Sequence, residues 1–443
     1  MELSGKKVVV LGLGISGISA ANFCAARGAE VLASDEADES RLSGLQDIAS
    51  GIEIRVGRAL PDPADFDLVV PSPGIPRERY AERARAVSGD IELAGCFLEV
   101  PIIAVTGTNG KSTTVGLIEA MLRSAGLRAQ AAGNIGTPAL SLVGKPLDVA
   151  VLEVSSFQLE AVDRFHPQVA VVLNISPDHL DRHGDFDGYC RAKQRIFANQ
   201  QPSDTAIVNL DDAATRGLAS TCKAAVRGFS RRTAVDDGAC LDSGAVMLRT
   251  GGQIQRIPLD GLRLAGVHNL ENVLAAVLAV TAVGADPVRA IGALADFSGL
   301  PHRCQVVATV AEVTFVDDSK ATNPGAAQRS LEGFESPLIW IAGGRDKGLD
   351  FESLADVAAT RVKSALFYGE AAALLESAVA GRIDVQRVVD LDEAVSRASE
   401  LAQSGDVVLL APACASFDQF KNFEERGEHF CSAVRALTRE ATS

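Results

Sequence analysis

Residues 102–122 read "IIAVTGTNGKSTTVGLIEAML", an apolar strand followed by a glycine-containing turn and an amphipathic helix. Gly107 and Gly110 lie in the turn, and Lys111 and Ser112 open the helix. This order points successive backbone N–H groups and the positive end of the helix at an anion. Lys111 adds a charge suited to phosphate oxygens, and Ser112 adds a hydroxyl suited to Mg²⁺. The stretch therefore predicts a phosphate-binding loop in an α/β domain.

The loop is shorter than the usual strand, loop and helix motif for phosphate. Five positions before Gly110 that motif has a further glycine, and here the residue is Val105. Thr113 offers a second hydroxyl beside Ser112. A tight turn that only caps a helix would explain the glycines alone. We favour the phosphate interpretation because the strand, the glycines, Lys111 and Ser112 all stand where binding needs them.

Strand-like apolar runs alternate with helical patterns along nearly the whole chain, as in parallel sheets with crossover helices. Examples are "KVVVLG", "DVAVLEVS" and "PLIWIAGG". With 443 residues the chain exceeds a single hydrophobic core. We expect an α/β protein of three domains: Rossmann-like at 1–95, P-loop ATPase-like with a mainly parallel sheet at 96–298, and Rossmann-like at 299–443. Weak strand patterns at 219–258 do not define clear elements.

The composition is that of an ordinary globular protein, with 47% apolar and 22% charged residues. The formal net charge of −15 disfavours nucleic acid and anionic membranes as partners. No apolar run approaches the roughly 18 residues of a membrane span, and no secretory signal is visible. The eight cysteines contain no C-x-x-C pair, so we expect reduced thiols, no zinc site and a cytoplasmic location.

A second glycine-rich turn lies near the N-terminus in "LGLGISG", where Gly12, Gly14 and Gly17 follow the order G-x-G-x-x-G. This spacing brings the backbone and a helix start close to a diphosphate. Asp35 ends the next strand, a pattern that also fits a nicotinamide-dependent oxidoreductase. The turn therefore predicts diphosphate binding without identifying the nucleotide. The oxidoreductase alternative leaves the loop at Lys111 without a role.

Polar residues follow two further strands of the central segment. Glu153 lies near the end of the strand in "DVAVLEVSSFQLE", where a carboxylate could bind Mg²⁺ or simply be exposed at the strand tip. His179 and His183 follow the next strand in "NISPDHLDRHGD", with an i, i+4 spacing but without the glutamate of a zinc-protease helix. Solvated loop histidines would give the same pattern. The end of a parallel strand is a common ligand position, which favours a role for His179.

The motifs "GTNGKST", "EVSSFQLE", "SPDHLDRH" and "YCRAKQRIFANQ" resemble the central domain of the ATP-dependent Mur ligases, which add amino acids to a UDP-linked cell-wall precursor. "DDSKATNP" and "PACASFDQFKNFEERG" are similar to the branch of that family that adds D-glutamate. With "LGLGISG" and "GLPHR", the resemblance covers all three expected domains.

The resemblance implies an ATP-driven peptide ligation. ATP would phosphorylate the L-alanine carboxylate of UDP-N-acetylmuramoyl-L-alanine, and the D-glutamate amine would displace phosphate, leaving ADP and phosphate as products. Phosphorylation supplies the leaving group that a carboxylate lacks, and cations disperse the charge of the transferring phosphoryl group. ATP and two Mg²⁺ ions are the implied cofactors. We expect a cytoplasmic monomer.

Residues that match the family's motifs divide into a reactive set and an ATP set. The reactive and metal-binding set is Lys111, Ser112, Glu153, His179 and Lys193, with Lys193 carbamylated so that it becomes a metal-binding carboxylate analogue. The ATP contacts implied are Gly107, Thr108, Asn109, Gly110, Lys111, Ser112, Thr113, Asn269, Asn272, Arg303, Asp318 and Lys320. From the sequence alone, Lys193 could equally lie on a solvated helix face, and the two asparagines could be helix-capping residues.

The substrate contacts implied by the resemblance come from all three domains. Those for the UDP moiety and neighbouring groups are Ile15, Ser16, Gly17, Asp35, Ser72, Pro73, Gly74 and Asn134, and those for the alanyl end are Ser155 and Ser156. Those for D-glutamate are Thr322, Lys347, Ser416, Phe417 and Phe423. Without the resemblance, Thr322 and Lys347 would be read as turn residues and Phe423 as core packing.

Other functions remain as alternatives. Another ligase of the same family, or folylpolyglutamate synthetase, would share the central domain, although the N-terminal glycine turn and "DQFKNF" argue against the latter. A non-catalytic ATP-binding scaffold would not need Lys111, Glu153, His179 and Lys193 together.

Overall fold

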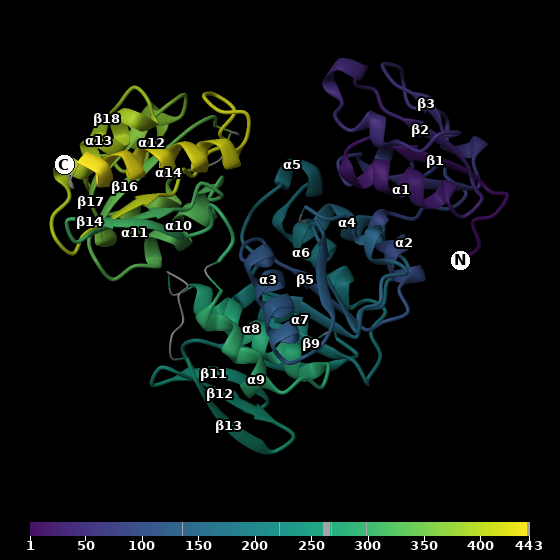
Figure 1. The fold of residues 1–443 in the computed structure, drawn as a ribbon, viewed down its shortest axis with the longest axis horizontal. Coiled ribbons are helices and arrows are strands. Elements are labelled where there is room, and N and C mark those ends of the chain that lie inside the picture. Colours follow the sequence, from purple (N-terminus) through teal and green to yellow (C-terminus); the bar gives the residue numbers. More distant parts are fainter. Residues whose placement is uncertain are drawn as a thin grey trace. The chain divides into compact units, whose positions relative to one another are not determined.

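The computed structural model describes residues 1–134, 136–220, 222–259, 266, 268–297, 299–346, 348 and 350–440. Three separate sheets, each with its own helices, confirm the predicted α/β class with three domains (Figure 1). By contacts the chain forms two compact units: Met1–Leu259 with Val273–Ala293, and Asp260–Asn272 with Leu294–Ser443. The first unit contains both the N-terminal and the central sheet. The boundaries expected at 95 and 298 remain predictions.

The N-terminal sheet is parallel, with strand order β3-β2-β1-β4. Along β1, Val8 and Val10 pack into the large core of the first unit, while Val9 and Leu11 pack on the other face of the sheet. This alternation is the two-residue period of a strand buried on both sides. The elements are β1 (Lys7–Leu11), α1 (Ile15–Ala25), β2 (Glu30–Ser34), β3 (Glu53–Arg55), β4 (Leu68–Pro71) and α2 (Asp90–Phe97).

The central sheet has the order β13-β12-β11-β10-β9-β8-β5-β7-β6, and its segment from β6 to β11 is parallel. Residues 219–258, which the sequence left unassigned, supply most of one edge, where β12 and β13 pair antiparallel. The strands are β5 (Ile102–Thr106), β6 (Ala129–Gly133), β7 (Val149–Glu153), β8 (Val169–Val172), β9 (Thr205–Asn209), β10 (Ala225–Ser230), β11 (Gly238–Asp242), β12 (Ala245–Thr250) and β13 (Gln253–Pro258).

The helices that follow these strands carry most of the expected reactive residues. They are α3 (Lys111–Ser124), α4 (Ser156–Glu160), α5 (Leu180–His183), α6 (Phe186–Gln194), α7 (Ala213–Ala219), α8 (His268–Ala282) and α9 (Pro287–Ile291). Short 3-10 turns complete both units: η1 (Glu39–Arg41), η2 (Leu45–Asp47), η3 (Pro63–Asp65), η4 (Arg77–Arg79), η5 (Ala139–Leu142), η6 (Arg195–Phe197) and η7 (Gly292–Ala295).

The C-terminal sheet has the order β14-β15-β19-β16-β17-β18 and is parallel except for β14. Trp340 faces the helices α10 to α12, whereas Ile339 and Ile341 face α13 and α14. Helices thus cover both faces, as in doubly wound folds. The elements are β14 (Gln305–Val310), β15 (Val313–Asp317), α10 (Pro324–Glu332), β16 (Leu338–Gly343), α11 (Ser353–Arg361), β17 (Val362–Tyr368), α12 (Ala372–Ala378), β18 (Asp384–Arg387), α13 (Leu391–Leu401), β19 (Val407–Leu410) and α14 (Phe423–Glu440).

Two features bear on the expectations from composition. None of the eight cysteines, all of which lie in the described part of the chain, takes part in a disulfide. Among the residues that the structure describes, no helix has the length and apolar character needed to cross a membrane.

Candidate active site

The phosphate-binding turn predicted from the sequence lies between β5 and α3. Gly107 and Gly110 have φ angles of +154° and +83°, values that L side chains rarely adopt, so both positions need glycine. Asn174, just beyond β8, fixes the loop: its Oδ1 accepts from the Asn109 N–H and its Nδ2 donates to the Asn109 carbonyl, both at 2.9 Å. The turn is therefore held in a defined conformation at the start of a helix of 14 residues.

Two lysines converge on this turn. The Lys111 ammonium donates to the carbonyl oxygens of Gly107 and Thr108 at 2.9 and 2.8 Å. Lys193 donates to the same Gly107 oxygen at 2.9 Å and is only 1% exposed. Burial, and after it the charge of Lys111, lowers the pKa of Lys193 well below its usual range. The alternative prediction that Lys193 lies on a solvated helix face is wrong, because its side chain points from α6 into the protein interior.

Glu153 is buried at the end of β7 beside the same turn. Its Oε2 accepts from the Ser112 hydroxyl at 2.5 Å, and its Oε1 accepts from the Asn134 amide at 2.8 Å. The alternative prediction, that Glu153 is exposed at the tip of its strand, is wrong, since Glu153 is 2% exposed. A carboxylate and a hydroxyl in contact form an oxygen donor set that suits Mg²⁺.

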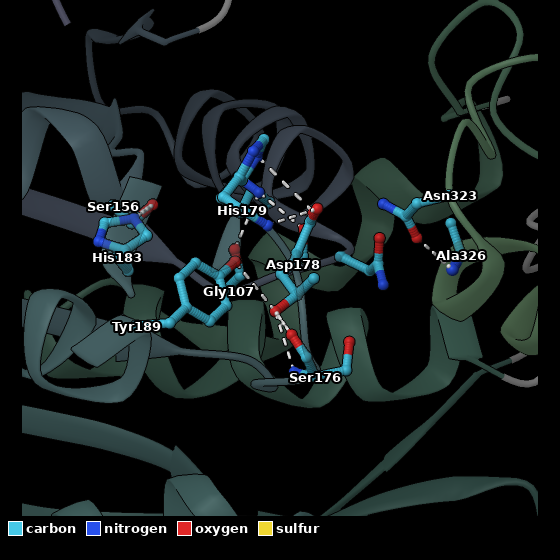
Figure 2. A network of polar contacts seen from close by, with 12 residues as sticks. Gly107, Ser156, Ser176, Asp178, His179, His183, Tyr189, Asn323 and Ala326 are labelled. Carbon is cyan, nitrogen blue, oxygen red and sulfur yellow. Dashed lines mark hydrogen bonds and ion pairs between the residues drawn. The ribbon is translucent and has the colours of Figure 1, made fainter. Parts of the chain in front are cut away.

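The two histidines after β8 differ in their surroundings (Figure 2). His179 adopts a left-handed φ of +53°, with its Nε2 3.7 Å from an Asp178 oxygen. Its side chain is 47% exposed. His183 is not the solvated residue that the sequence allowed: its Nε2 lies 3.1 Å from the Ser156 hydroxyl and its Nδ1 3.3 Å from Glu160. Burial lowers the pKa of His183, which favours the neutral ring.

The serines of "EVSSFQLE" lie at the start of α4. Ser155 caps the helix in a reciprocal capping box, in which its hydroxyl accepts from the Gln158 N–H and the Gln158 side chain accepts from the Ser155 N–H. The amide Nε2 of Gln158 donates to the buried carboxylate of Asp90 at 2.9 Å. Ser156 is 4% exposed and contacts His183. The local sequence predicts the cap, while only the fold reveals the connection to Asp90.

A cavity of about 520 Å³ lies at the first glycine turn. Residues from the N-terminal segment line it together with a loop after β6, all within the first compact unit. Of the residues expected to contact the UDP moiety, the lining includes Ile15, Ser16, Asp35, Ser72, Pro73, Gly74 and Asn134. Gly17 does not line the cavity and lies in α1 behind the turn.

Two side chains hold the first glycine turn in place by hydrogen bonds. The Asp35 carboxylate accepts from the Leu13 N–H at 2.7 Å, and the Ser72 hydroxyl donates to the Gly12 carbonyl at 2.7 Å. A Cβ on Gly17 would stand 1.8 Å from the Gly12 oxygen, whereas one on Gly14 would meet nothing within 4 Å. The G-x-G-x-x-G spacing is thus explained by a close backbone approach at Gly17 and open space at Gly14.

In the second unit, the expected ATP contacts cluster after β15. Asp318 is buried, which raises the pKa of its carboxyl, and it accepts hydrogen bonds from the Ser330 hydroxyl and the Cys304 N–H. The Lys320 ammonium lies 3.7 Å from the centroid of the Phe423 ring, a cation–π contact. Arg303 is partly buried in the adjoining loop. Phe423 therefore does more than fill the core.

His302 ties these loops together. Its Nδ1 lies 2.7 Å from Asp317 Oδ2, and its carbonyl accepts from the Lys320 N–H at 3.1 Å. The hydrogen bond with Asp317 raises the pKa of His302, although burial opposes it. Cys431 Sγ lies 3.4 Å from the same Asp317 oxygen. A Cβ at Gly427 would fall 2.1 Å from the His302 ring nitrogen, so α14 has no side chain at that position.

The other expected residues of this unit are more dispersed. Thr322 follows Lys320 in a turn, Ser416 is 2% exposed in the loop after β19, and neighbouring Phe417 is 59% exposed. Asn269 and Asn272 are buried at the start of α8 and share a hydrogen bond of 2.9 Å. Lys347 lies outside the described residues.

The structure thus brings together Lys111, Ser112, Glu153 and Lys193 around one turn, and most of the expected UDP contacts around one cavity. Asn134 belongs to both places. The sequence reasoning missed Asn174 and Asp90, and it left His183 as a solvated histidine. An asparagine directly after a buried strand was a usable signal for Asn174; for the others, the signal lies in contacts between distant segments.

The three sheets and the turn after β5 define a three-domain α/β protein with a short strand–turn–helix loop of the kind that binds phosphate. Three family models match it: "Mur ligase MurD-like, N-terminal domain" over residues 6–95, "Mur ligase middle domain" over 105–280 and "Mur ligase, glutamate ligase domain" over 302–414. The chain belongs to the Mur ligase family. The predicted resemblance is confirmed, and with it an ATP-dependent, ADP-forming ligase rather than an oxidoreductase.

Individual relatives agree with this family. A "UDP-N-acetylmuramoylalanine--D-glutamate ligase" of Geotalea daltonii is 42% identical, with 99% of each chain covered. Among solved structures, a pseudomurein peptide ligase type C from Methanothermus fervidus has a TM-score of 0.63 at 18% identity, covering 98% of this chain and all of that one. The MurF ligase from Thermotoga maritima, solved in complex with ADP, has a TM-score of 0.62 at 18% identity, covering 99% and 96%. The likeness to the two structures concerns the fold alone.

Proposed function

We propose that the protein joins D-glutamate to UDP-N-acetylmuramoyl-L-alanine at the expense of ATP, as a step of peptidoglycan precursor synthesis. The observation that carries this proposal is the position of Asn134. It lines the cavity at the first glycine turn and also donates to Glu153 beside the phosphate-binding turn. A substrate whose UDP end occupied the cavity could therefore extend its far end to the place where a phosphoryl group is transferred.

Formation of the new amide bond requires that the alanyl carboxylate first be activated. Transfer of the γ-phosphoryl group of ATP to the alanyl carboxylate forms an acyl phosphate and ADP, and attack by the D-glutamate amine then releases phosphate. Lys111, at the start of α3, would neutralise charge on the phosphoryl oxygens together with the helix N-terminus. Ser155 and Ser156 are the proposed contacts of the alanyl end. The neutral ring of His183, beside Ser156, adds no positive charge to this position.

We propose two Mg²⁺ ions, held by Ser112 and Glu153 and by His179 and a carbamylated Lys193. The paired hydroxyl and carboxylate of Ser112 and Glu153 fit such an ion. Burial of Lys193 favours its neutral amine, the form that reacts with CO₂ to give a carbamate and a proton. When bound, the ions would supply positive charge to the phosphoryl oxygens.

D-Glutamate and part of the ATP contacts are assigned to the second unit. Thr322, Lys347, Ser416, Phe417 and Phe423 stay as proposed contacts of D-glutamate, and Arg303, Asp318, Lys320, Asn269 and Asn272 stay as proposed contacts of ATP. A monomer working in the cytoplasm, where ATP is available, completes the proposal.

The test is phosphate release by the purified chain with ATP, Mg²⁺, UDP-N-acetylmuramoyl-L-alanine and D-glutamate. We expect release only when all four are present, and a product heavier than the UDP precursor by one glutamyl residue in mass spectrometry. Omission of each component in turn is the control. Release that does not depend on D-glutamate, or that proceeds equally with L-glutamate, would contradict the proposal.

A further inference from the structure

Arg426, on α14, is completely buried in the C-terminal domain, with an exposed fraction of 0%. Its Nε donates to the Ser319 hydroxyl at 2.9 Å and its Nη2 to the Ser319 carbonyl at 2.7 Å. Its Nη1 donates to the carbonyls of Cys414 at 3.2 Å and Gly343 at 3.4 Å. Each of the three nitrogens of this guanidinium fork thus donates a hydrogen bond to a backbone or hydroxyl oxygen.

These partners lie in three different loops at one edge of the sheet. Ser319 follows β15, Gly343 ends β16 and Cys414 follows β19. The three strands are adjacent and parallel, so their carboxyl ends meet at the edge where doubly wound sheets bind ligands. Arg426 reaches this edge from a helix that lies later in the chain than all three loops.

Two of the three loops also carry described residues that we propose contact D-glutamate. Thr322 lies three residues after Ser319, and Ser416 lies two residues after Cys414. A Cβ at Gly344 would stand 2.1 Å from the Ala415 carbonyl oxygen and 3.2 Å from an Arg426 nitrogen, so the backbone of two of these loops and the guanidinium lie close together here.

The buried positive charge of Arg426 indicates a role in addition to packing. No carboxylate of the described residues forms an ion pair with Arg426, whose four hydrogen bonds all end on neutral oxygens. Burying a charge without an opposite partner is costly, and a methionine of similar length would fill the same space without that cost. The buried charge of Arg426 is explained if the carboxyl ends of β15, β19 and β16 form a site that binds an anion.

We propose that Arg426 is the positioning residue of the D-glutamate site. It fixes the three loops relative to one another and adds positive potential beneath an amino acid that carries two carboxylates. This inference rests on the proposed function and deepens it, because it names the residue that organises the amino-acid end of the site without touching the substrate.

The experiment compares Arg426→Met, which removes the charge and the fork, with Arg426→Lys, which keeps the charge alone. Arg435→Met, an exposed arginine of the same helix, is the matched control. Steady-state phosphate release yields KM for D-glutamate and for the UDP precursor. Trp340, the single tryptophan, is buried in the C-terminal core, so its fluorescence in urea reports whether that domain is folded.

We expect KM for D-glutamate to rise about tenfold or more in Arg426→Met, the scale of lost charged hydrogen bonds, with partial recovery in Arg426→Lys. KM for the UDP precursor should stay within about twofold, since its proposed cavity lies in the other unit. If Arg426→Met does not fold, the same comparison is made with Arg426→Lys. A folded variant with unchanged KM for D-glutamate overturns this inference alone. A wild-type protein that releases phosphate without D-glutamate overturns the proposed function and the inference with it.

Discussion

The Nζ of Lys193 donates a hydrogen bond of 2.9 Å to the carbonyl oxygen of Gly107, in the turn proposed to bind the phosphates of ATP. Lys111 donates to the same oxygen, so two amines share one acceptor. Water is largely excluded from Lys193, and Lys111 adds repulsion, so the protonated form is disfavoured. A lysine in this position is suited to carry a group other than a proton.

Replacement of Lys193 by alanine is expected to lower kcat by about a hundredfold or more, a loss typical of a preorganised charged group at a phosphoryl-transfer site. Because the proposed carbamate acts as a carboxylate, added acetate or formate should restore part of the rate. Arg191→Ala, on the exposed face of the same helix, should have little effect. Full activity in Lys193→Ala would remove this residue from the site, and a loss that no short carboxylate restores would contradict the carbamate.

Alanine at Gly14 and at Gly17 should have opposite consequences. At Gly17 a Cβ would collide with the Gly12 carbonyl, so we expect a distorted turn and a loss of about 1–3 kcal/mol in the free energy of unfolding. At Gly14 the added methyl meets no protein atom within 4 Å but projects at the proposed diphosphate position. Gly14→Ala should keep its stability and bind the UDP precursor at least about tenfold more weakly. Thermal unfolding and titration calorimetry separate the two effects, and unimpaired binding by Gly14→Ala would place the diphosphate elsewhere.

Asp90 connects two parts of the proposed UDP-substrate site. Its buried carboxylate accepts from the side chain of Gln158, next to the alanyl contacts, and burial raises the pKa of Asp90 while Gln158 and Ser16, at the first glycine turn, oppose that rise. Asp90→Ala would leave the Gln158 amide without its acceptor, and we expect KM for the UDP precursor to rise about fivefold to tenfold while KM for ATP changes little. Glu99→Gln, an exposed acid just beyond α2, serves as the control. Equal increases in both KM values would indicate a general loss of structure instead.

The His302–Asp317 pair should make the stability of the C-terminal domain depend on pH. The hydrogen bond raises the pKa of His302 in the folded protein, and Glu424 and Glu428 on α14 act in the same direction. A raised pKa means that the stabilisation is fully present below the unfolded value of about 6.5 and is lost as pH rises through the folded value.

Urea unfolding followed by Trp340 fluorescence measures this stabilisation. At pH 6, His302→Gln should be less stable than the wild type by about 1.5–3 kcal/mol, the scale of a charged hydrogen bond. The difference should shrink towards pH 9, because His302 loses its proton in the folded protein as the pH rises through its raised pKa. His429→Gln, whose more exposed imidazole faces Asp392, is the histidine control. A difference that is the same at both pH values would show that His302 acts by packing alone.

Much of the fold could be predicted because its signals are local. The strand, turn and helix around Lys111, the alternation of strands and helices and the G-x-G-x-x-G turn each depend on residues within one short segment. Residues 219–258 could not be assigned because edge strands lack continuous apolar runs and take their order from pairing with neighbours.

The candidate site was predictable in residue type and less so in environment. Arg191 and Lys193 are two basic residues on one helix, and no local pattern tells that the first faces solvent while the second is buried. The orientation of α6 against the turn decides it, because burial is a property of packing between segments.

The sequence alone determined the class of fold, the phosphate-binding loop and the family, since these reside in contiguous motifs whose spacing is set by strand and helix geometry. The tertiary structure decided which charges are buried, and which distant residues meet. It brought Asn134 to Glu153, Asp90 to Gln158 and Arg426 to three loops that are far apart in the chain. The physical reason is that desolvation and hydrogen bonding act through space, whereas periodicity and motif spacing act along the chain.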